Sequence, residues 1–162
     1  MLSIGRPWIS DERVRNAESE KEENNVRERA YAYFDEQDIS YEEIDSIATR
    51  FTYEDENYIF LYAPDEDDEF VYIWTDIPFE EDLSKNELPE KMHKAFCIQE
   101  YMKFIKVNMD MDRTRFRFAV EQYIDPNTDI NALLHRMIKV LNGSVSLYKA
   151  DDDDYLLPET DD

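Results

Sequence analysis

The hydrophobic positions in the first half of the chain change from the period of a helix to the period of a strand. Within residues 19–36 the apolar residues recur on one helix face, which predicts an amphipathic helix. Within residues 44–53 they alternate with polar residues, and the runs 57–63 and 69–75 are rich in aromatic and β-branched residues. We therefore expect one helix and then three strands, the last two forming a hairpin.

The pattern then repeats with a second helix and two strands. Pro89 suits the first turn of a helix, because its missing N–H would have no partner there, and an apolar face continues to about residue 103. Residues 105–109 and 116–120 alternate apolar and polar positions on either side of Asp112, which predicts a second hairpin with one apolar face. A second helix that continues through Val107 is the alternative interpretation.

The most regular helical pattern lies near the end of the chain. From residue 130 to residue 141 the apolar residues step at i, i+3 and i+4, and the same stripe reaches Tyr148. A glycine in a helix interior costs only about 1 kcal/mol. We therefore expect this helix to pass through Gly143 and to end near Ala150.

Together these elements predict a single α+β domain over residues 19–150, in the order helix, three strands, helix, two strands, helix, with an antiparallel sheet. A chain of 162 residues can bury roughly 70% of the surface that it exposes when unfolded. Residues 1–18 are predicted to form a flexible arm. Residues 151–162 carry seven acidic and no basic residues, which predicts a disordered acidic tail.

The charge balance excludes several classes of partner. Forty acidic residues against 18 Lys and Arg give a net charge of -22 and a pI near 4.3. This charge repels nucleic acid and anionic membrane surfaces, and no apolar run is long enough to span a membrane. Because the start of the chain lacks a secretory signal and the single Cys97 cannot form an internal disulfide, we expect a cytoplasmic protein that binds neither nucleic acid nor membranes.

An acidic segment joins the two strands of the first hairpin and is a candidate cation site. Residues 63–70 read APDEDDEF, in which Asp65, Asp67 and Asp68 could ligate a divalent ion. An EF-hand loop that starts at Asp65 requires Gly at its sixth position and Glu at its twelfth, where this chain has Phe70 and Asp76. The preferred interpretation is a solvated hairpin loop whose charges discourage strand pairing at the edge.

His93 and Cys97 are the second candidate for chemistry, because a spacing of four residues places both on one helix face. With turn carboxylates such as Asp110 and Asp112 they could serve a small metal-sensing or hydrolytic protein. Two ligands do not make a metal site, and only His135 could be added to them. The two glycines of the chain leave no phosphate-binding loop. We therefore expect no metal, no cofactor and no enzymatic activity, and keep the metal-sensing or hydrolytic protein as the alternative.

Five of the 18 cations lie within 15 residues of each other. Their simplest role is to pair with nearby carboxylates on a solvated sheet face, where single ion pairs contribute little to stability. A functional role would be contact with an acidic partner, including a second copy of this chain. These residues are Lys103, Lys106, Arg113, Arg115 and Arg117.

The first hairpin is apolar on both faces. Simple alternation places its six aromatic rings on one face and its aliphatic residues on the other. If helices cover the aliphatic face, half-exposed rings present on the order of 450 Å², which is typical of an association site. Alternatively, residues 76–88 or the N-terminal arm cover the rings. The predicted partner or dimer surface comprises Tyr58, Phe60, Tyr62, Phe70, Tyr72 and Trp74.

Three stretches carry a resemblance to a known fold: the helix before YEEIDSIATRFTYEDENYIFLYA, the strand FVYIWTDIP, and the run RFRFAVEQYIDPNTDINALLHRMIKVL. Over about residues 26–149, their order on an acidic chain resembles the YbjN-like branch of the type III secretion chaperone-like fold. The resemblance implies a non-enzymatic, homodimeric module that binds a protein partner or client polypeptide, with a chaperone-like or regulatory role. The fold has no shared catalytic residues, so none is carried over to this chain.

Overall fold

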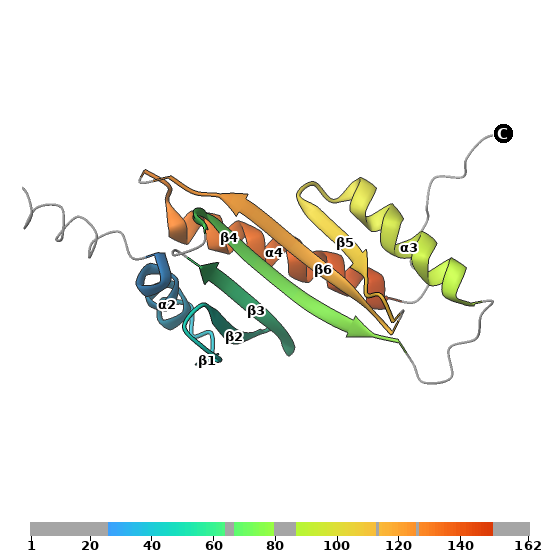
Figure 1. The fold of residues 1–162 in the computed structure, drawn as a ribbon, viewed down its shortest axis with the longest axis horizontal. Helices are drawn as coiled ribbons and strands as arrows, with labels where there is room; N and C mark the ends of the chain where they lie inside the picture. Colours follow the sequence, from blue (N-terminus) through green and yellow to red (C-terminus); the bar gives the residue numbers. More distant parts are fainter. Residues whose placement is uncertain (1–25, 64–66, 80–86, 113, 126, 151–162) are drawn as a thin grey trace, which may run out of the picture.

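A six-stranded antiparallel sheet with helices on one side forms the body of the protein (Figure 1). The computed structural model describes residues 26–63, 67–79, 87–112, 114–125 and 127–150. The strands lie in the order β1-β2-β3-β4-β6-β5. In chain order the elements are α2 (Val26–Glu36), β1 (Tyr41–Glu43), β2 (Ala48–Tyr53), β3 (Glu56–Ala63), β4 (Asp67–Pro78), α3 (Glu87–Tyr101), β5 (Ile105–Met109), β6 (Arg115–Tyr123) and α4 (Ile130–Lys149). For the described residues this confirms the predicted α+β domain with an antiparallel sheet.

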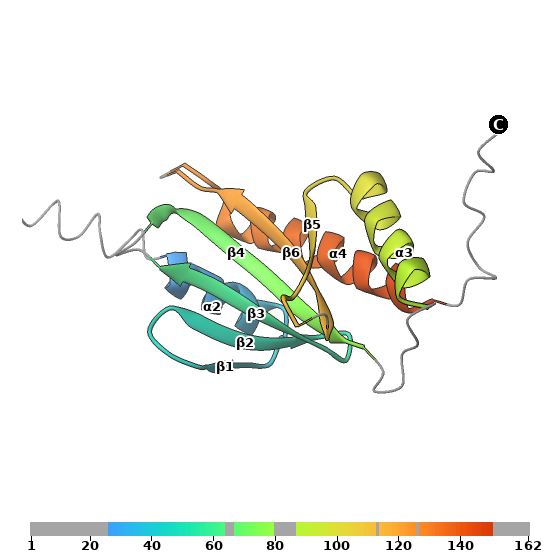
Figure 2. The same ribbon diagram turned by 45° about the vertical axis from the view of Figure 1, so that its right-hand side comes forward.

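The helices pack on one face of the sheet and at one of its edges. α2 and α4 lie against the same face, and α3 lies beside β5 and α4 (Figure 2). α4 starts after Asp129, whose carboxylate accepts a hydrogen bond from the Ala132 N–H at 3.1 Å. It passes through Gly143 and ends at Lys149, as the hydrophobic stripe predicts. Within the described part of the chain, no helix combines the length and apolarity needed to cross a bilayer.

The boundaries of the remaining elements agree with the sequence pattern in part. α3 ends at Tyr101 and β5 follows, so the alternative of a helix through Val107 is wrong, and the second hairpin is confirmed. β2 begins later than expected, and the short strand β1 was not predicted. Residues 19–25 of the predicted first helix, the predicted arm 1–18 and the predicted tail 151–162 lie outside the described residues.

Both edges of the sheet are short or covered. β1, at one edge, has three residues, of which two are glutamates. At the other edge α3 lies along β5, and the Val107 N–H donates a hydrogen bond to Gln99 Oε1 at 2.7 Å. This donor of the edge strand is therefore satisfied within the chain rather than free to pair with another strand.

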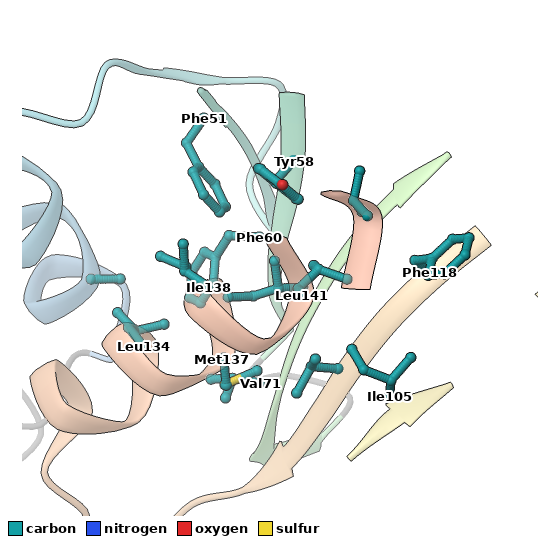
Figure 3. Close-up of a cluster of buried hydrophobic side chains, with 14 of the residues drawn as sticks. Phe51, Tyr58, Phe60, Val71, Ile105, Phe118, Leu134, Met137, Ile138 and Leu141 are labelled. Atoms are coloured by element: carbon teal, nitrogen blue, oxygen red, sulfur yellow. The ribbon is translucent and has the colours of Figure 1, made fainter. Parts of the chain in front are cut away.

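The core lies between the sheet and the two helices that cover it (Figure 3). Aromatic rings of α2, β2 and β3 stack in one part of this core. Phe34 of α2 stacks on Phe51 with ring centroids 4.9 Å apart, and Phe51 stacks on Tyr58 at 5.3 Å. Aliphatic residues of α4 fill the space between these rings and β6. The labelled side chains of this cluster are Phe51, Tyr58, Phe60, Val71, Ile105, Phe118, Leu134, Met137, Ile138 and Leu141.

The first hairpin corrects the predicted partner surface. Tyr58 and Phe60 are each 1% exposed and Tyr62 is 8% exposed, so these three rings belong to the core. In the pairing of β3 with β4, Phe60 lies opposite Ile73, whereas Trp74 lies opposite Ile59. Directly opposed residues point to the same face of a sheet. The prediction that all six rings share one face is therefore wrong.

An irregularity between Leu61 and Ala63 is the cause of this exchange of faces. Next to the turn, Ala63 pairs with Asp67, and that register continued without interruption would place Phe60 opposite Phe70. Beyond the irregularity Phe60 instead lies opposite Ile73, three residues further along β4. An odd shift of register moves every following side chain to the other face. The helices consequently cover the rings of β3 together with the aliphatic residues of β4.

A buried polar network ties the turn between β2 and β3 to α4. Tyr58 Oη donates to Asn142 Oδ1 at 2.7 Å, and Asn142 Nδ2 donates to Glu54 Oε2 at 2.6 Å. Glu54 and Asp55 have φ values of 48° and 67°, so both central residues of this two-residue turn have the left-handed backbone of a type I′ hairpin. Burial raises the pKa of Tyr58 well above 10, and the nearby Glu56 and Glu54 carboxylates raise it further.

We predict that Tyr58→Phe lowers the free energy of unfolding at neutral pH by about 1–3 kcal/mol, because Asn142 Oδ1 loses its buried donor. The raised pKa of Tyr58 contributes stability that is complete below the ordinary value of 10.0 and is lost as the pH rises above it. The variant lacks this ionisation. Urea unfolding at increasing pH should therefore show the gap between the variant and the parent narrowing above pH 10.

Tyr101→Phe is the matched control, since Tyr101 is 73% exposed and should change the free energy of unfolding little at any pH. A gap between Tyr58→Phe and the parent that stays constant above pH 10 would contradict the prediction.

Candidate functional site: the open face of the sheet

One face of the sheet is covered by no described helix, and we call it the open face. The register places Ile59 and Leu61 of β3 directly beside Trp74 and Tyr72 of β4 on this face. These four side chains are partly exposed. We call the apolar side chains of this face the apolar strip: Ile59, Leu61, Phe70, Tyr72, Trp74 and Tyr123.

The rings of the apolar strip pack against each other. Phe70 and Tyr123 lie opposite on β4 and β6, with ring centroids 3.8 Å apart, and Tyr72 and Trp74 are 5.1 Å apart. Arg117 Cζ lies 5.2 Å from the centre of the Trp74 ring, within reach of a cation–π interaction. Partial burial raises the pKa of Tyr72, although the charge of Arg117 opposes this shift. The strip is thus an ordered surface with its rings fixed by neighbours on the same face.

Ion pairs surround the strip. Arg117 holds Asp76 with two hydrogen bonds of 2.7 and 2.8 Å, and this contact raises the pKa of the guanidinium. Arg115 contacts both Asp110, at 3.1 Å, and Asp76, at 3.7 Å. At the other side of the sheet Arg50 pairs with Glu42 at 3.3 Å, and on β5 and β6 Lys106 pairs with Glu121. Each of these four cations therefore meets a carboxylate of the same face or of its adjoining turn.

A hollow of about 270 Å³ lies at the end of the open face, over the turn between β5 and β6. The Thr114 hydroxyl and N–H hydrogen-bond to Asp110, each at 2.7 Å, and with Arg115 they hold the pKa of that carboxyl well below its usual value. The carboxylates and guanidinium groups of this hollow pair with each other. It is lined by Asp76, Asn108, Met109, Asp110, Arg115 and Arg117.

The five cations that lie close together in the sequence between Lys103 and Arg117 do not form one group in the structure. Lys106, Arg115 and Arg117 pair with carboxylates, which is the simpler of the two roles that the sequence suggests. Lys103 is exposed in the connection between α3 and β5, and Arg113 lies outside the described residues. Contact of these cations with an acidic partner stays a prediction.

His93 and Cys97 do lie together on α3, with Cys97 Sγ 3.6 Å from His93 Nε2. His135 is on α4, where its Nδ1 lies 3.2 Å from Tyr33 Oη. Among the residues that the structure describes, no three His, Cys, Asp or Glu side chains gather as metal ligands would. Asp65 lies outside the described residues, as do the side chains of Asp67 and Asp68, so the predicted cation site of the acidic loop stays untested.

A second surface lies on the helix side, where the chain leaves α3. Phe104 has φ of 75°, a left-handed backbone that is an outlier for a large side chain, and its ring is 57% exposed. The ring borders a small hollow of about 30 Å³ between β6 and α4. Its walls are Phe104, Val120, Gln122, Leu133, Arg136, Met137 and Val140.

Part of both surfaces was not predicted from the sequence. Simple alternation put Ile59 and Leu61 on the aliphatic face, opposite the predicted partner surface, because the irregularity in β3 leaves no mark on the alternation of residues. Tyr123 was not selected, although its place at the end of a one-sided strand, two residues beyond Glu121, is a usable signal. Phe104 gives no signal in sequence, since its strain is visible only as a backbone angle.

Comparisons with known proteins identify the fold. No known family model and no curated protein sequence matches this chain. An uncharacterised protein from Methanothermobacter thermautotrophicus has a similar crystal structure, with a TM-score of 0.59 and 14% identity, covering 75% of this chain and 93% of that one. YbjN from E. coli, a proposed transcription regulator, is similar with a TM-score of 0.54 and 9% identity, covering 75% of this chain and 86% of YbjN. The predicted YbjN-like fold is confirmed.

We predict that Phe104→Gly is more stable than Phe104→Ala by about 1 kcal/mol. Both variants remove the ring, but only glycine adopts a positive φ without steric cost. Midpoints of urea unfolding measure the difference. Equal midpoints for the two variants would show that the backbone at residue 104 relaxes and that the native chain holds no strain there.

Proposed function

We propose that this chain is a non-enzymatic protein-binding module of regulatory or chaperone-like character, and that it forms a homodimer through the open face. The observation that carries the proposal is the apolar strip. Its aromatic and aliphatic side chains lie together, partly exposed, on a face that no described helix covers. A contiguous apolar patch with a polar rim is the usual anatomy of a protein interface.

The charge distribution supports a second copy of the chain as the occupant of this face. Each copy carries a net charge of -22, so two copies repel each other at most orientations. On the open face the cations Arg50, Lys106 and Arg117 each pair with a carboxylate, which cancels the local charge. Face-to-face contact therefore brings two acidic molecules together where their repulsion is weakest.

The dimensions of the face suit a dimer. Six strands spaced about 4.8 Å apart are roughly 24 Å wide, and nine paired residues of β4 and β6 extend about 30 Å. A face of about 700 Å² is close to the roughly 800 Å² that each partner contributes to a standard interface. Under two-fold symmetry the central strands β4 and β6 lie near the axis. Trp74 and Tyr72, near the centre of the face, are then the residues whose burial contributes most.

The comparison with YbjN supports action through protein contacts rather than catalysis. That neighbour is a proposed transcription regulator and has the same fold. The competing metal-sensing or hydrolytic function needs a third group beside His93 and Cys97, and the described residues supply no such cluster. In this proposal the dimer acts by holding a partner polypeptide.

We predict that the double variant Tyr72→Ser, Trp74→Ser is a folded monomer at concentrations where the parent is a dimer. Both side chains are partly exposed on the open face, so their loss removes interface area and leaves the buried cluster intact. Light scattering gives the mass, and urea unfolding reports the fold. Phe60→Ser is the control, since this 1%-exposed ring lies in the core. Its loss should lower the free energy of unfolding by several kcal/mol.

Unfolding of the Tyr72→Ser, Trp74→Ser variant would mean that the two rings are required for the fold itself. A dimer of unchanged affinity would place the contact between copies elsewhere.

Salt should strengthen the dimer. Between about 0.01 M and 0.15 M salt the Debye length falls from about 30 Å to 8 Å, which screens the repulsion between two chains of net charge -22. The contact between apolar strips does not depend on charge, and the ion pairs lie within each chain, so salt screens no attraction between the copies. Sedimentation or light scattering across this range measures the dissociation constant. A dimer that weakens as salt is added would instead depend on ion pairs between the copies.

A further inference from the structure

A second apolar surface with a cationic rim lies on the helix side of the molecule, and we call it the α4 groove. Its centre is the small hollow that the exposed Phe104 ring borders, between β6 and the outer part of α4. Phe104, Leu133, Arg136 and Val140 line the hollow. We include in the groove the exposed residues Lys103 and Lys139, which are the chain neighbours of Phe104 and Val140.

The cations of the α4 groove differ from those of the open face. Lys103, Arg136 and Lys139 are exposed and take part in none of the ion pairs between described residues. On a chain with 40 acidic and 18 basic residues, three exposed cations in and beside one apolar hollow, none of them paired with a described carboxylate, are unusual. Such a surface attracts an acidic ligand that carries apolar side chains.

Residues 151–162 of the same chain have this chemistry. They read DDDDYLLPETDD, with the apolar residues Tyr155, Leu156 and Leu157 between four aspartates on one side and three acidic residues on the other. The apolar core and charged flanks of this segment complement the hollow and the cations of the groove. We propose that residues 151–162 dock in the α4 groove of their own chain.

The position where α4 ends allows this contact. The Ala150 carbonyl accepts a hydrogen bond from Lys94 Nζ at 2.6 Å, so the chain leaves α4 on the helix side, next to α3. Val140 lies ten residues before Ala150, which is about 15 Å along the helix. Tyr155 and Leu157 lie five and seven residues beyond Ala150 and reach about 16–24 Å when extended. An extended segment that turns back along α4 therefore brings its apolar residues to the hollow.

The path follows the side of α4 that carries the exposed residues Lys139 and Ser146. It does not pass over Gly143, because Met102 Cε lies 3.6 Å from the place that a Cβ would take there. The four aspartates then pass Lys139 while Glu159 and the last two aspartates approach Arg136 and Lys103. The open face is the poorer site for this segment, because its cations are already paired and it lies on the opposite side of the sheet from α4.

Paramagnetic NMR on the full chain tests the proposal. With Cys97→Ser removing the single cysteine, Thr160→Cys carries a nitroxide label, and backbone amide signals are compared before and after the label is reduced. Docking predicts loss of signal for residues 133–140 and Phe104, with signals of the β1–β2 hairpin unaffected at the far edge of the sheet. In about 1 M salt, where the Debye length is about 3 Å, the loss should diminish.

Two variants and one control separate docking from random encounter. Leu156→Ser with Leu157→Ser alters no described residue and should abolish the signal loss in the groove. Arg136→Glu with Lys139→Glu should do the same. The control Arg50→Glu with Lys106→Glu makes the same change of net charge on the open face and should leave the signal loss as it was.

Three results overturn the proposal. The first is signal loss confined to the last turn of α4, and the second is an unchanged loss in the Leu156→Ser, Leu157→Ser variant. The third comes from mixing spin-labelled chains with separate isotope-labelled chains. Loss in that mixture, equal to the loss within one chain, would show that the segment docks on a neighbouring copy. If the mixture shows no signal loss, but a chain that carries both the spin label and the isotope label does, the result supports docking within one chain.

Discussion

The pairing register between β3 and β4 decides which side chains of this protein are core and which are surface. Both strands are apolar on both faces, so either register would bury a hydrophobic layer under α2 and α4. The irregularity between Leu61 and Ala63 selects the register in which Tyr58 and Phe60 face the helices while Tyr72 and Trp74 face away. The aromatic stack of the core and the apolar strip of the open face both follow from this one choice.

The same choice separates two surfaces that differ in electrostatic character. On the open face each described cation pairs with a carboxylate, and the pair of Arg117 with Asp76 also fixes a guanidinium against the Trp74 ring. On the helix side, Arg136 lines an apolar hollow and Lys139 is exposed next to the lining residue Val140, and neither cation joins an ion pair of the described residues. The open face, whose cations are neutralised by carboxylates, suits the proposed second copy of this chain. The α4 groove, with its exposed cations, suits the proposed acidic segment 151–162. A strongly acidic chain can therefore offer two distinct contacts without depending on its net charge.

Sequence predicted the elements whose pattern has one dominant period. α4 was placed through Gly143 to its end because its stripe continues on both sides of the glycine, and β6 was oriented correctly because its outer positions are charged. The facing of the first hairpin was not predictable, because a strand with apolar residues on both sides carries no mark of its register. The turn at Glu54 and Asp55 lacks the glycine that normally signals a type I′ hairpin. The contact of Arg117 with Asp76 joins residues 41 positions apart and follows only from the sheet order.

The protection of the sheet edges limits how copies of this protein can assemble. β1 is too short and too acidic to receive another strand, and α3 occupies the border of β5, where Gln99 takes the hydrogen bond of Val107. Growth of a continuous ribbon from molecule to molecule is disfavoured at both borders. In the proposed dimer, by contrast, two open faces meet about a two-fold axis and bury the exposed apolar area of both molecules at once. The protected edges therefore work against open-ended polymers and leave the proposed closed pair unaffected.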